Sequence, residues 1–325
     1  MPRAYSNTGM AFRARSDILS LARRGDPAMF FWRRPPGFTA LEPILPELPE
    51  VETIARTLAP QVLRRVLGNP RCFGGKTPQA GREFLPLLEG AEVAGVRRRA
   101  KLLLLDLLDV SNRPLIMAFH LKMTGHLFVH PLEAVPPKHT KLILDLYPDS
   151  RTSAPEARLL FDDARTFGYC RILRPESLEE WPFWAALGLE PLEHAPEELA
   201  AALAGKKRQI KNLLLDQSLI VGIGNIYADE SLFRAGIRPD RQGAGIPGER
   251  LLALAGHVQE ILREAIAACG SSIRDYLDAQ GNSGAFQDNF KVYGRGGKPC
   301  QVCGGILQSC RVAGRGTVYC PRCQK

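Results

Sequence analysis

A proline beside three carboxylates is the most reactive combination in this chain. Pro46 and Glu47 follow Leu45, and Glu50 and Glu52 come next, at the start of an apolar helical pattern. Inside a chain, proline is tolerated in the first helical turn, where glutamates favour the positive end of the helix dipole. As the first residue, it would instead carry a free secondary amine. Because α-amino groups have a pKa of about 8, part of such an amine is unprotonated at neutral pH and can attack an electrophilic carbon.

Four cysteines form two Cys-x2-Cys pairs separated by sixteen residues, and they are Cys300, Cys303, Cys320 and Cys323. Paired thiolates at this spacing close a tetrahedral zinc site. Because four protein ligands leave no open coordination position, we predict one structural zinc ion per chain. Cys310 lies between the pairs and is not expected to be a ligand.

The composition favours a chain with two domains and a polyanionic partner. With 325 residues, the chain can bury more than one core. Its formal net charge of +9 suits a nucleic acid. No apolar run approaches the roughly 20 residues that span a bilayer, so we expect no membrane association. Cysteines grouped as a metal site predict a reducing compartment, the cytoplasm.

Residues 1–45 have no sustained periodicity. Their first 44 positions hold seven arginines and three acidic residues, a net charge of +4. Transit peptides have this composition, and so does upstream sequence translated in frame from a start codon set too early. We favour the second interpretation, in which translation begins at codon 45. We predict that residues 1–45 are disordered or absent from the mature protein.

The rest of the chain shows two kinds of pattern. Apolar residues three and four positions apart predict an amphipathic helix from Val51. Short β-like runs then predict the strands of a β-sandwich at 92–98, 102–108, 115–121, 141–147, 158–162 and 170–173. After a connecting stretch near 175–196, helices are predicted at 197–203, 209–216, 227–234 and 249–268.

Several motifs occur in one order along residues 46–325. The run Pro-Glu-Leu-Pro-Glu-Val-Glu at 46–52 resembles the N-terminus of the formamidopyrimidine-DNA glycosylase family, bacterial enzymes of 8-oxoguanine repair. Further stretches similar to that family are 120–125, 163–168, 221–233 and 313–320. The resemblance implies an α+β multidomain fold. Its parts are an N-terminal β-sandwich with flanking helices, a C-terminal helix–two-turns–helix domain and a zinc-binding β-hairpin.

The resemblance also divides the chain. We expect a catalytic β-sandwich domain at 46–175 and a helix–two-turns–helix DNA-binding domain at 176–270. A lesion-recognition loop with its linker is expected at 271–296, and a zinc finger at 297–325.

The function that the resemblance implies is that of a bifunctional glycosylase and lyase, acting as a monomer on duplex DNA. Such an enzyme removes oxidised purines and nicks the abasic site by β,δ-elimination. In the family the initiator Met is removed, so Pro46 would form the Schiff base with the sugar. Glu47 would act as general acid and base. Lys101 would assist elimination and bind phosphate.

Other residues match the family's DNA contacts. The resemblance implies DNA binding by Lys141, Arg165, Lys211, Asn225 and Arg315. It implies a base-flip wedge of Met123, Arg165 and Phe167, with Arg165 facing the orphaned cytosine. It implies a lesion pocket that includes Glu230, Ser271, Ser272 and Arg274. The chain departs from the family pattern at Lys122, where Gly is usual.

Three alternatives remain open at this point. The first is an endonuclease VIII-like enzyme of the same fold that removes oxidised pyrimidines. The second is a DNA-damage-binding protein without catalysis, if the residues before Pro46 are retained. The third is a zinc-ribbon interaction protein with no lesion chemistry.

Overall fold

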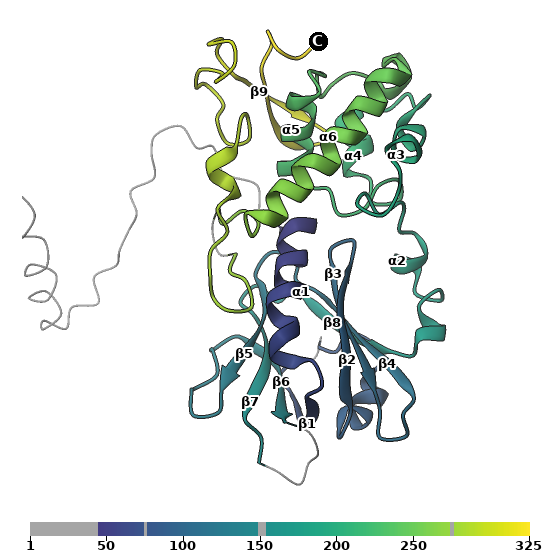
Figure 1. Cartoon of the computed structure of the whole chain (residues 1–325), viewed down its shortest axis with the longest axis vertical. Helices are drawn as coiled ribbons and strands as arrows, with labels where there is room; N and C mark the ends of the chain where they lie inside the picture. The colour runs from purple at the N-terminus through teal and green to yellow at the C-terminus, as the bar shows by residue number, and fades with distance from the viewer. Residues whose placement is uncertain (1–44, 75–76, 149–153, 274–275) are drawn as a thin grey trace, which may run out of the picture. The chain divides into compact units, whose positions relative to one another are not determined.

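The computed structural model describes residues 45–74, 77–148, 154–273 and 276–325 (Figure 1). The disorder predicted for residues 1–45 therefore falls, except for Leu45, outside the described residues, and so does Arg274. Within the described ranges, no helix has the length and apolar character that crossing a membrane requires.

The N-terminal half is a β-sandwich made from one bent antiparallel sheet. Its strands lie in the order β5-β7-β6-β1-β2-β3-β4-β8. Strands β1 and β2 pair near Val66 and Glu92, where the sheet turns from one half to the other. The strands are β1 (Val66–Cys72), β2 (Glu92–Arg99), β3 (Leu102–Leu108), β4 (Pro114–His120), β5 (Gly125–Pro131), β6 (Thr140–Tyr147), β7 (Ala157–Asp163) and β8 (Tyr169–Leu173).

Strand β3 is almost entirely leucine because both of its faces are buried. Its alternate residues face two different apolar clusters, because successive side chains of a strand point to opposite faces. Leu103 and Leu105 belong to the core between the two halves of the sheet, together with Phe161. Leu102 and Leu104 pack on the other side, in the cluster that contains Trp181.

The six predicted strands are confirmed to within one or two residues. Strands β1 and β5 were not predicted, since polar and turn-forming residues interrupt their apolar pattern: Gly68, Asn69 and Pro70 in β1, and His126 and His130 in β5.

Helix α1 (Leu48–Val62) connects the two cores. Its first residue, Leu48, packs in the helical domain, whereas Val51, Ile54 and Leu58 pack in the sandwich. The helix begins three residues before the predicted Val51. The added turn is stabilised by a capping box, in which the Glu47 amide donates to Glu50 Oε2 at 2.9 Å.

The C-terminal half is helical and ends in a hairpin. The four predicted helices are confirmed, and the short α2 is additional. The helices are α2 (Pro182–Ala185), α3 (Pro196–Leu203), α4 (Ile210–Leu215), α5 (Asn225–Arg234) and α6 (Gly248–Ala267), and the 3-10 helices are η2 (Arg82–Leu88), η3 (Pro175–Ser177), η4 (Gly243–Gly245) and η5 (Phe286–Asn289). Strands β9 (Gln308–Val312) and β10 (Arg315–Tyr319) form the hairpin.

Candidate active site

Glu47 is buried and attaches the start of α1 to the start of α5. Its carboxylate accepts the amide of Gly224 at 2.7 Å and that of Ile226 at 3.0 Å. These amides lie at the positive N-terminal end of α5, a natural anion site. A side chain at Gly224 would place its Cβ 2.4 Å from the Glu47 carboxyl carbon, so only glycine allows this contact.

Burial raises the pKa of the Glu47 carboxyl to about 7, while the charge of Lys101 opposes the shift. The neighbouring Glu50 raises the pKa of Glu47 further. A carboxyl with a pKa near the working pH can both give and take a proton, as general acid–base catalysis requires.

Glu50 fixes the same turn from the other side. Its carboxylate accepts the amide of Ser271 at 2.8 Å and the hydroxyl of Tyr227 at 2.6 Å. Tyr276 donates to the Glu50 carbonyl at 3.3 Å. Hydrogen bonds from Tyr227 of α5, from Ser271 and from Tyr276 therefore fix the turn that carries Pro46.

Two pockets share Leu45, and Pro46 lines the first of them. We name both pockets after roles that the resemblance implies. The first, the base pocket, is lined by residues that include Pro46, Glu50, Met123, Arg165, Ser271 and Tyr276. The second, the phosphate pocket, is lined by residues that include Glu47, Lys101, His120, Lys122, Asn225 and Arg315. Leu45 lines both pockets. The Leu45–Pro46 peptide bond thus lies where the two pockets adjoin.

Lys101 reaches the phosphate pocket from the turn between β2 and β3. Its Nζ donates to the Ile223 carbonyl at 3.1 Å, and burial lowers its pKa. The turn is held by Glu190, which is buried and accepts the Ala100 amide at 3.0 Å. Glu190 also pairs with Arg98 at 2.6 Å and with Arg99 at 3.0 Å.

His120 is a pocket residue to which the sequence analysis gave no role. Burial, with the charges of Lys122 and Lys101, lowers its pKa to about 3, so the imidazole is neutral at pH 7. Its Nδ1 accepts the Lys122 amide at 3.2 Å, which leaves the proton on Nε2 as a donor. The only sequence signal was its position at the head of the 120–125 motif.

Arg315 and Asn225 meet at the phosphate pocket, where Asn225 Nδ2 donates to the Gly316 carbonyl at 3.0 Å. Lys211 is fully buried behind them. Its Nζ lies 2.7 Å from Asp229 Oδ1 and donates to the Gly316 carbonyl at 3.0 Å. Lys211 therefore ties the hairpin to the helical domain and lines neither pocket beside Pro46.

Phe167 and three further residues predicted to contact DNA or the lesion also line neither pocket. Glu230 is buried and accepts the amides of residues 291–293 at 2.8–3.1 Å, which fixes the connection to the hairpin. Ser272 bonds within its own segment, to Tyr276 and Gln287. Lys141 lies on β6 and lines neither pocket. Of the predicted lesion-pocket residues that are described, only Ser271 lines the base pocket.

The predicted wedge residues lie on two neighbouring turns. Met123 and Arg165 line the base pocket, and the Arg165 guanidinium lies 5.1 Å from the centre of the exposed Phe167 ring. Asp163 organises the second turn by accepting the amides of Arg165 at 3.2 Å and Gly168 at 2.7 Å. An exposed ring and a cation thus project together beside the base pocket.

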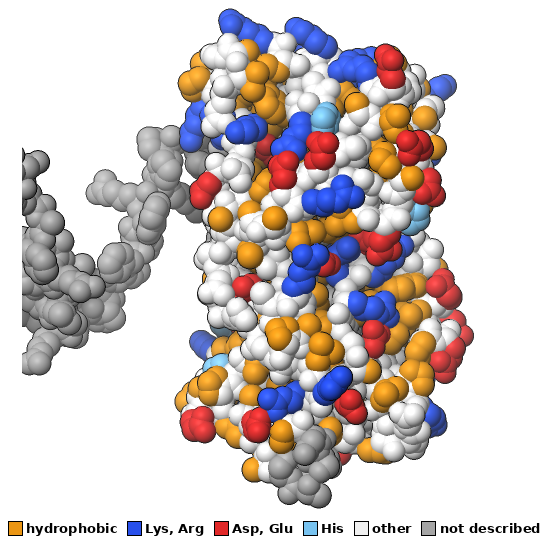
Figure 2. Space-filling view, viewed as in Figure 1, with side chains coloured by type: hydrophobic (Ala, Val, Ile, Leu, Met, Phe, Trp, Pro, Cys, Tyr) orange, Lys and Arg blue, Asp and Glu red, His pale blue; other side chains and the backbone are white. Residues whose placement is uncertain are grey.

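Surface charge alone does not locate the site. Lys and Arg side chains are spread over the face shown in Figure 2 and are interspersed with acidic ones. The phosphate pocket is different, because Lys101, Lys122 and Arg315 converge there with Glu47.

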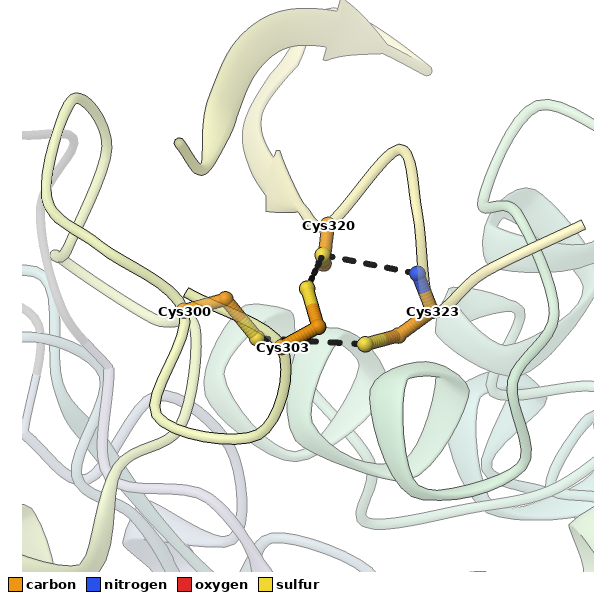
Figure 3. A group of neighbouring side chains, drawn as sticks. All are labelled: Cys300, Cys303, Cys320 and Cys323. Atoms are coloured by element: carbon orange, nitrogen blue, oxygen red, sulfur yellow. Dashed lines mark hydrogen bonds between the residues drawn. The ribbon is translucent and has the colours of Figure 1, made fainter. Parts of the chain in front are cut away.

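The four paired cysteines form a zinc site (Figure 3). Their sulfur atoms all lie within 4.8 Å of one another; Cys303 and Cys320 are 3.4 Å apart, and Cys300 and Cys323 are 3.9 Å apart. Tetrahedral zinc with Zn–S distances of about 2.3 Å needs sulfurs about 3.8 Å apart, so the set fits one ion. Cys310 lies on β9 opposite Thr317 and is outside the set, as predicted.

We expect Cys320→Ala to lose the bound zinc and to weaken DNA binding. The cluster around the cysteines is small, so metal binding supplies much of the folding energy of the hairpin that carries Arg315. Zinc content by atomic absorption and DNA affinity by fluorescence anisotropy measure both effects. Cys310→Ala is the matched control and should retain one zinc. Normal lesion binding by zinc-free Cys320→Ala would contradict the expectation.

Three sequence-family models match consecutive parts of the chain. Residues 45–170 match the formamidopyrimidine-DNA glycosylase N-terminal domain, and residues 187–276 match the H2TH domain of the same enzymes. Residues 297–325 match the zinc finger found in FPG and IleRS.

Individual relatives agree with these matches. A formamidopyrimidine-DNA glycosylase of Desulfitobacterium hafniense is 42% identical over 284 residues, covering 86% of this chain and 100% of the relative. One from Nitratidesulfovibrio vulgaris is 57% identical over 209 residues, or 64% of this chain and 55% of the relative.

Solved structures give the same result. The Lactococcus lactis Fpg in complex with abasic-site DNA has a TM-score of 0.76 at 30% identity, covering 86% of this chain and 99% of that one. The wild-type L. lactis protein with N7-benzyl-Fapy-dG DNA has a TM-score of 0.76 at 31% identity, covering 86% and 100%.

Proposed function

Since the chain belongs to the formamidopyrimidine-DNA glycosylase family, we propose that Pro46, once its nitrogen is a free amine, carries the reaction. As a member of this family the protein binds damaged duplex DNA, removes oxidised purines and cleaves abasic sites as an AP lyase. The observation that supports the role of Pro46 is its position where the base pocket adjoins the phosphate pocket.

The two pockets suit the two ends of a flipped nucleotide. The damaged base leaves the stack, at a cost of a few kcal/mol, and enters the base pocket. The phosphates beside it enter the phosphate pocket with Lys101, Asn225 and Arg315. The deoxyribose C1′ then lies beside the Pro46 nitrogen. The amine lone pair forms the N–C1′ bond as the bond to the base breaks.

Glu47 and Lys101 then move protons around this intermediate. Glu47 in its acid form protonates the ring oxygen of the sugar as the ring opens. The iminium acidifies the C2′ proton, and its loss to a base expels the 3′ phosphate. A second elimination expels the 5′ phosphate and completes the nick. Lys101, which carries a lowered pKa, assists these proton transfers and pairs with the phosphate.

We further propose that the enzyme acts as a monomer in the bacterial cytoplasm. One chain supplies the residues of both pockets and all four zinc ligands. The relatives named above are bacterial, and a site of four cysteine thiolates suits a reducing compartment.

This function is tested by giving a protein that begins at Pro46 duplex DNA with one of two different lesions. Duplex DNA containing 8-oxoguanine opposite cytosine is expected to be cleaved and trapped by borohydride faster than DNA containing thymine glycol. The reverse preference would favour the endonuclease VIII-like alternative. Binding without cleavage of either duplex would favour the non-catalytic alternative.

We expect Arg165→Ala to relax the choice of base opposite the lesion. The Arg165 guanidinium is the hydrogen-bonding group beside the wedge, and each good contact to a base edge contributes about 1–3 kcal/mol of discrimination. Cleavage rates of 8-oxoguanine paired with cytosine and with adenine measure the ratio, which should fall about tenfold. Phe167→Ala is the control; it removes apolar contact and should slow both duplexes together. An unchanged ratio in Arg165→Ala would contradict this role.

A further inference from the structure

The phosphate pocket holds one more cation than the proposed mechanism uses. Lys122 lines it together with Lys101 and Arg315. Among the described residues, none of the three forms an ion pair with a carboxylate within 4 Å. Arg315 is exposed, but Lys101 and Lys122 are partly buried, and buried charges are costly unless an opposite charge compensates them. Glu47 is the carboxylate among the lining residues of this pocket, so three converging cations leave an excess of positive charge that favours an anionic ligand.

The backbone at Lys122 is one that a side chain disfavours. Its φ is +54°, in the left-handed region where glycine is the least strained residue. Glycine is also what the related 120–125 motif usually carries there. The backbone strain of a lysine in this conformation must be offset by a favourable interaction of its side chain. Its ammonium group lies over the Tyr169 ring, 5.7 Å from Nζ to the ring centre, and no ion pair with a described carboxylate stabilises it.

Contacts with His120 and Tyr169 hold Lys122 at the edge of the pocket. Its amide donates to His120 Nδ1 at 3.2 Å, which fixes the turn after β4. The His120 ring packs against Tyr169 at 5.5 Å and Phe183 at 6.0 Å between ring centres. The ammonium group thus lies over an aromatic ring at the edge of the pocket, and burial lowers its pKa. The charged groups facing it are Lys101, Glu47 and Arg315.

We propose that Lys122 binds a DNA backbone phosphate as a third cation of the phosphate pocket, beside Lys101 and Arg315. The inference rests on the proposed function of the same pocket and adds a residue to it. Such a cation also suits the products of strand cleavage. Each elimination converts a phosphodiester with one charge into a monoester that carries nearly two at neutral pH.

The experiment measures how binding depends on salt. The full chain and its Lys122 variants are titrated onto duplex DNA containing tetrahydrofuran, an abasic-site analogue that cannot be cleaved. Each phosphate contact contributes about 0.9 to the slope of log affinity against log salt. Lys122→Gly and Lys122→Gln are each expected to reduce this slope by about 0.9 and to weaken binding several-fold at low salt. Lys122→Arg should retain the slope.

Two controls separate charge from backbone strain. Lys122→Gly removes both, whereas Lys122→Gln removes only the charge, so equal losses of slope assign the effect to charge. Asn112→Gly also relieves a left-handed residue, at φ +57°, but on an exposed turn outside both pockets. It should leave the slope unchanged. An unchanged slope in both Lys122→Gly and Lys122→Gln overturns the proposal. If the unaltered protein did not prefer tetrahydrofuran DNA over undamaged duplex, the proposed function itself would fail instead.

Discussion

A protein that begins at Pro46 is expected to form a covalent adduct with abasic-site DNA under borohydride, whereas the 325-residue chain should bind the same DNA without being trapped. In the longer chain the Pro46 nitrogen belongs to a planar amide, with its lone pair delocalised. Loss of an essential nucleophile typically costs several orders of magnitude in rate, so the expected difference is about 10⁴-fold or more.

The structure adds a second reason for this expectation. Leu45 lines both the base pocket and the phosphate pocket, where the proposed mechanism positions the sugar. A chain that begins at Leu45 shows whether these two features suffice without residues 1–44. It carries only one additional residue but keeps the Pro46 amide, so it should bind DNA and resist trapping. The adducts are measured on denaturing gels, with each starting residue verified by intact mass.

One result would contradict the assignment of Pro46 as the nucleophile. Efficient trapping by verified 325-residue protein would move the nucleophile elsewhere. Lys101 would then be next, since burial lowers its pKa and its amine lies in the adjacent pocket.

Glu47→Gln is expected to slow opening of the sugar ring, and therefore strand cleavage, by about 10²–10⁴-fold, the usual contribution of a general acid or base. The wild-type carboxyl has a pKa of about 7, raised by burial, so its acid form is lost as the pH rises through 7. If that form protonates the ring oxygen of the sugar, the wild-type rate of strand cleavage falls above pH 7. Glutamine does not titrate, so the variant's slow rate should show no such fall.

Single-turnover strand cleavage of DNA containing 8-oxoguanine, between pH 5.5 and 8.5, measures both profiles. Glu52→Gln is the matched control, since Glu52 is in the same helix but pairs with Arg56 and Arg98. It should retain the fall near pH 7. A Glu47→Gln variant with the same pH-dependent fall would assign the titration to another group. Because Lys101 opposes the raised pKa, Lys101→Met is expected to move the fall to higher pH.

Local patterns in the sequence were sufficient for the zinc site and most of the secondary structure. Two Cys-x2-Cys pairs specify their metal by spacing alone, and the four sulfurs do converge. Apolar periodicity gave six strands and five helices, because it directly reflects which side of an element is buried. The patterns failed at β1 and β5, where polar and turn-forming residues occupy a strand whose pairing comes from distant neighbours.

The same sequence could not specify the environment of each site residue. Glu47 was identified by its motif, but its raised pKa depends on burial against Gly224, 177 residues away. A lysine on a short helix reads as exposed, yet Lys211 is buried against Asp229 and the hairpin. Glu230 is occupied by the amides of residues 291–293. Spacing along the chain fixes which groups share an element. Only the packing of α1 between two cores decides which groups from distant elements meet and which of them lose their water.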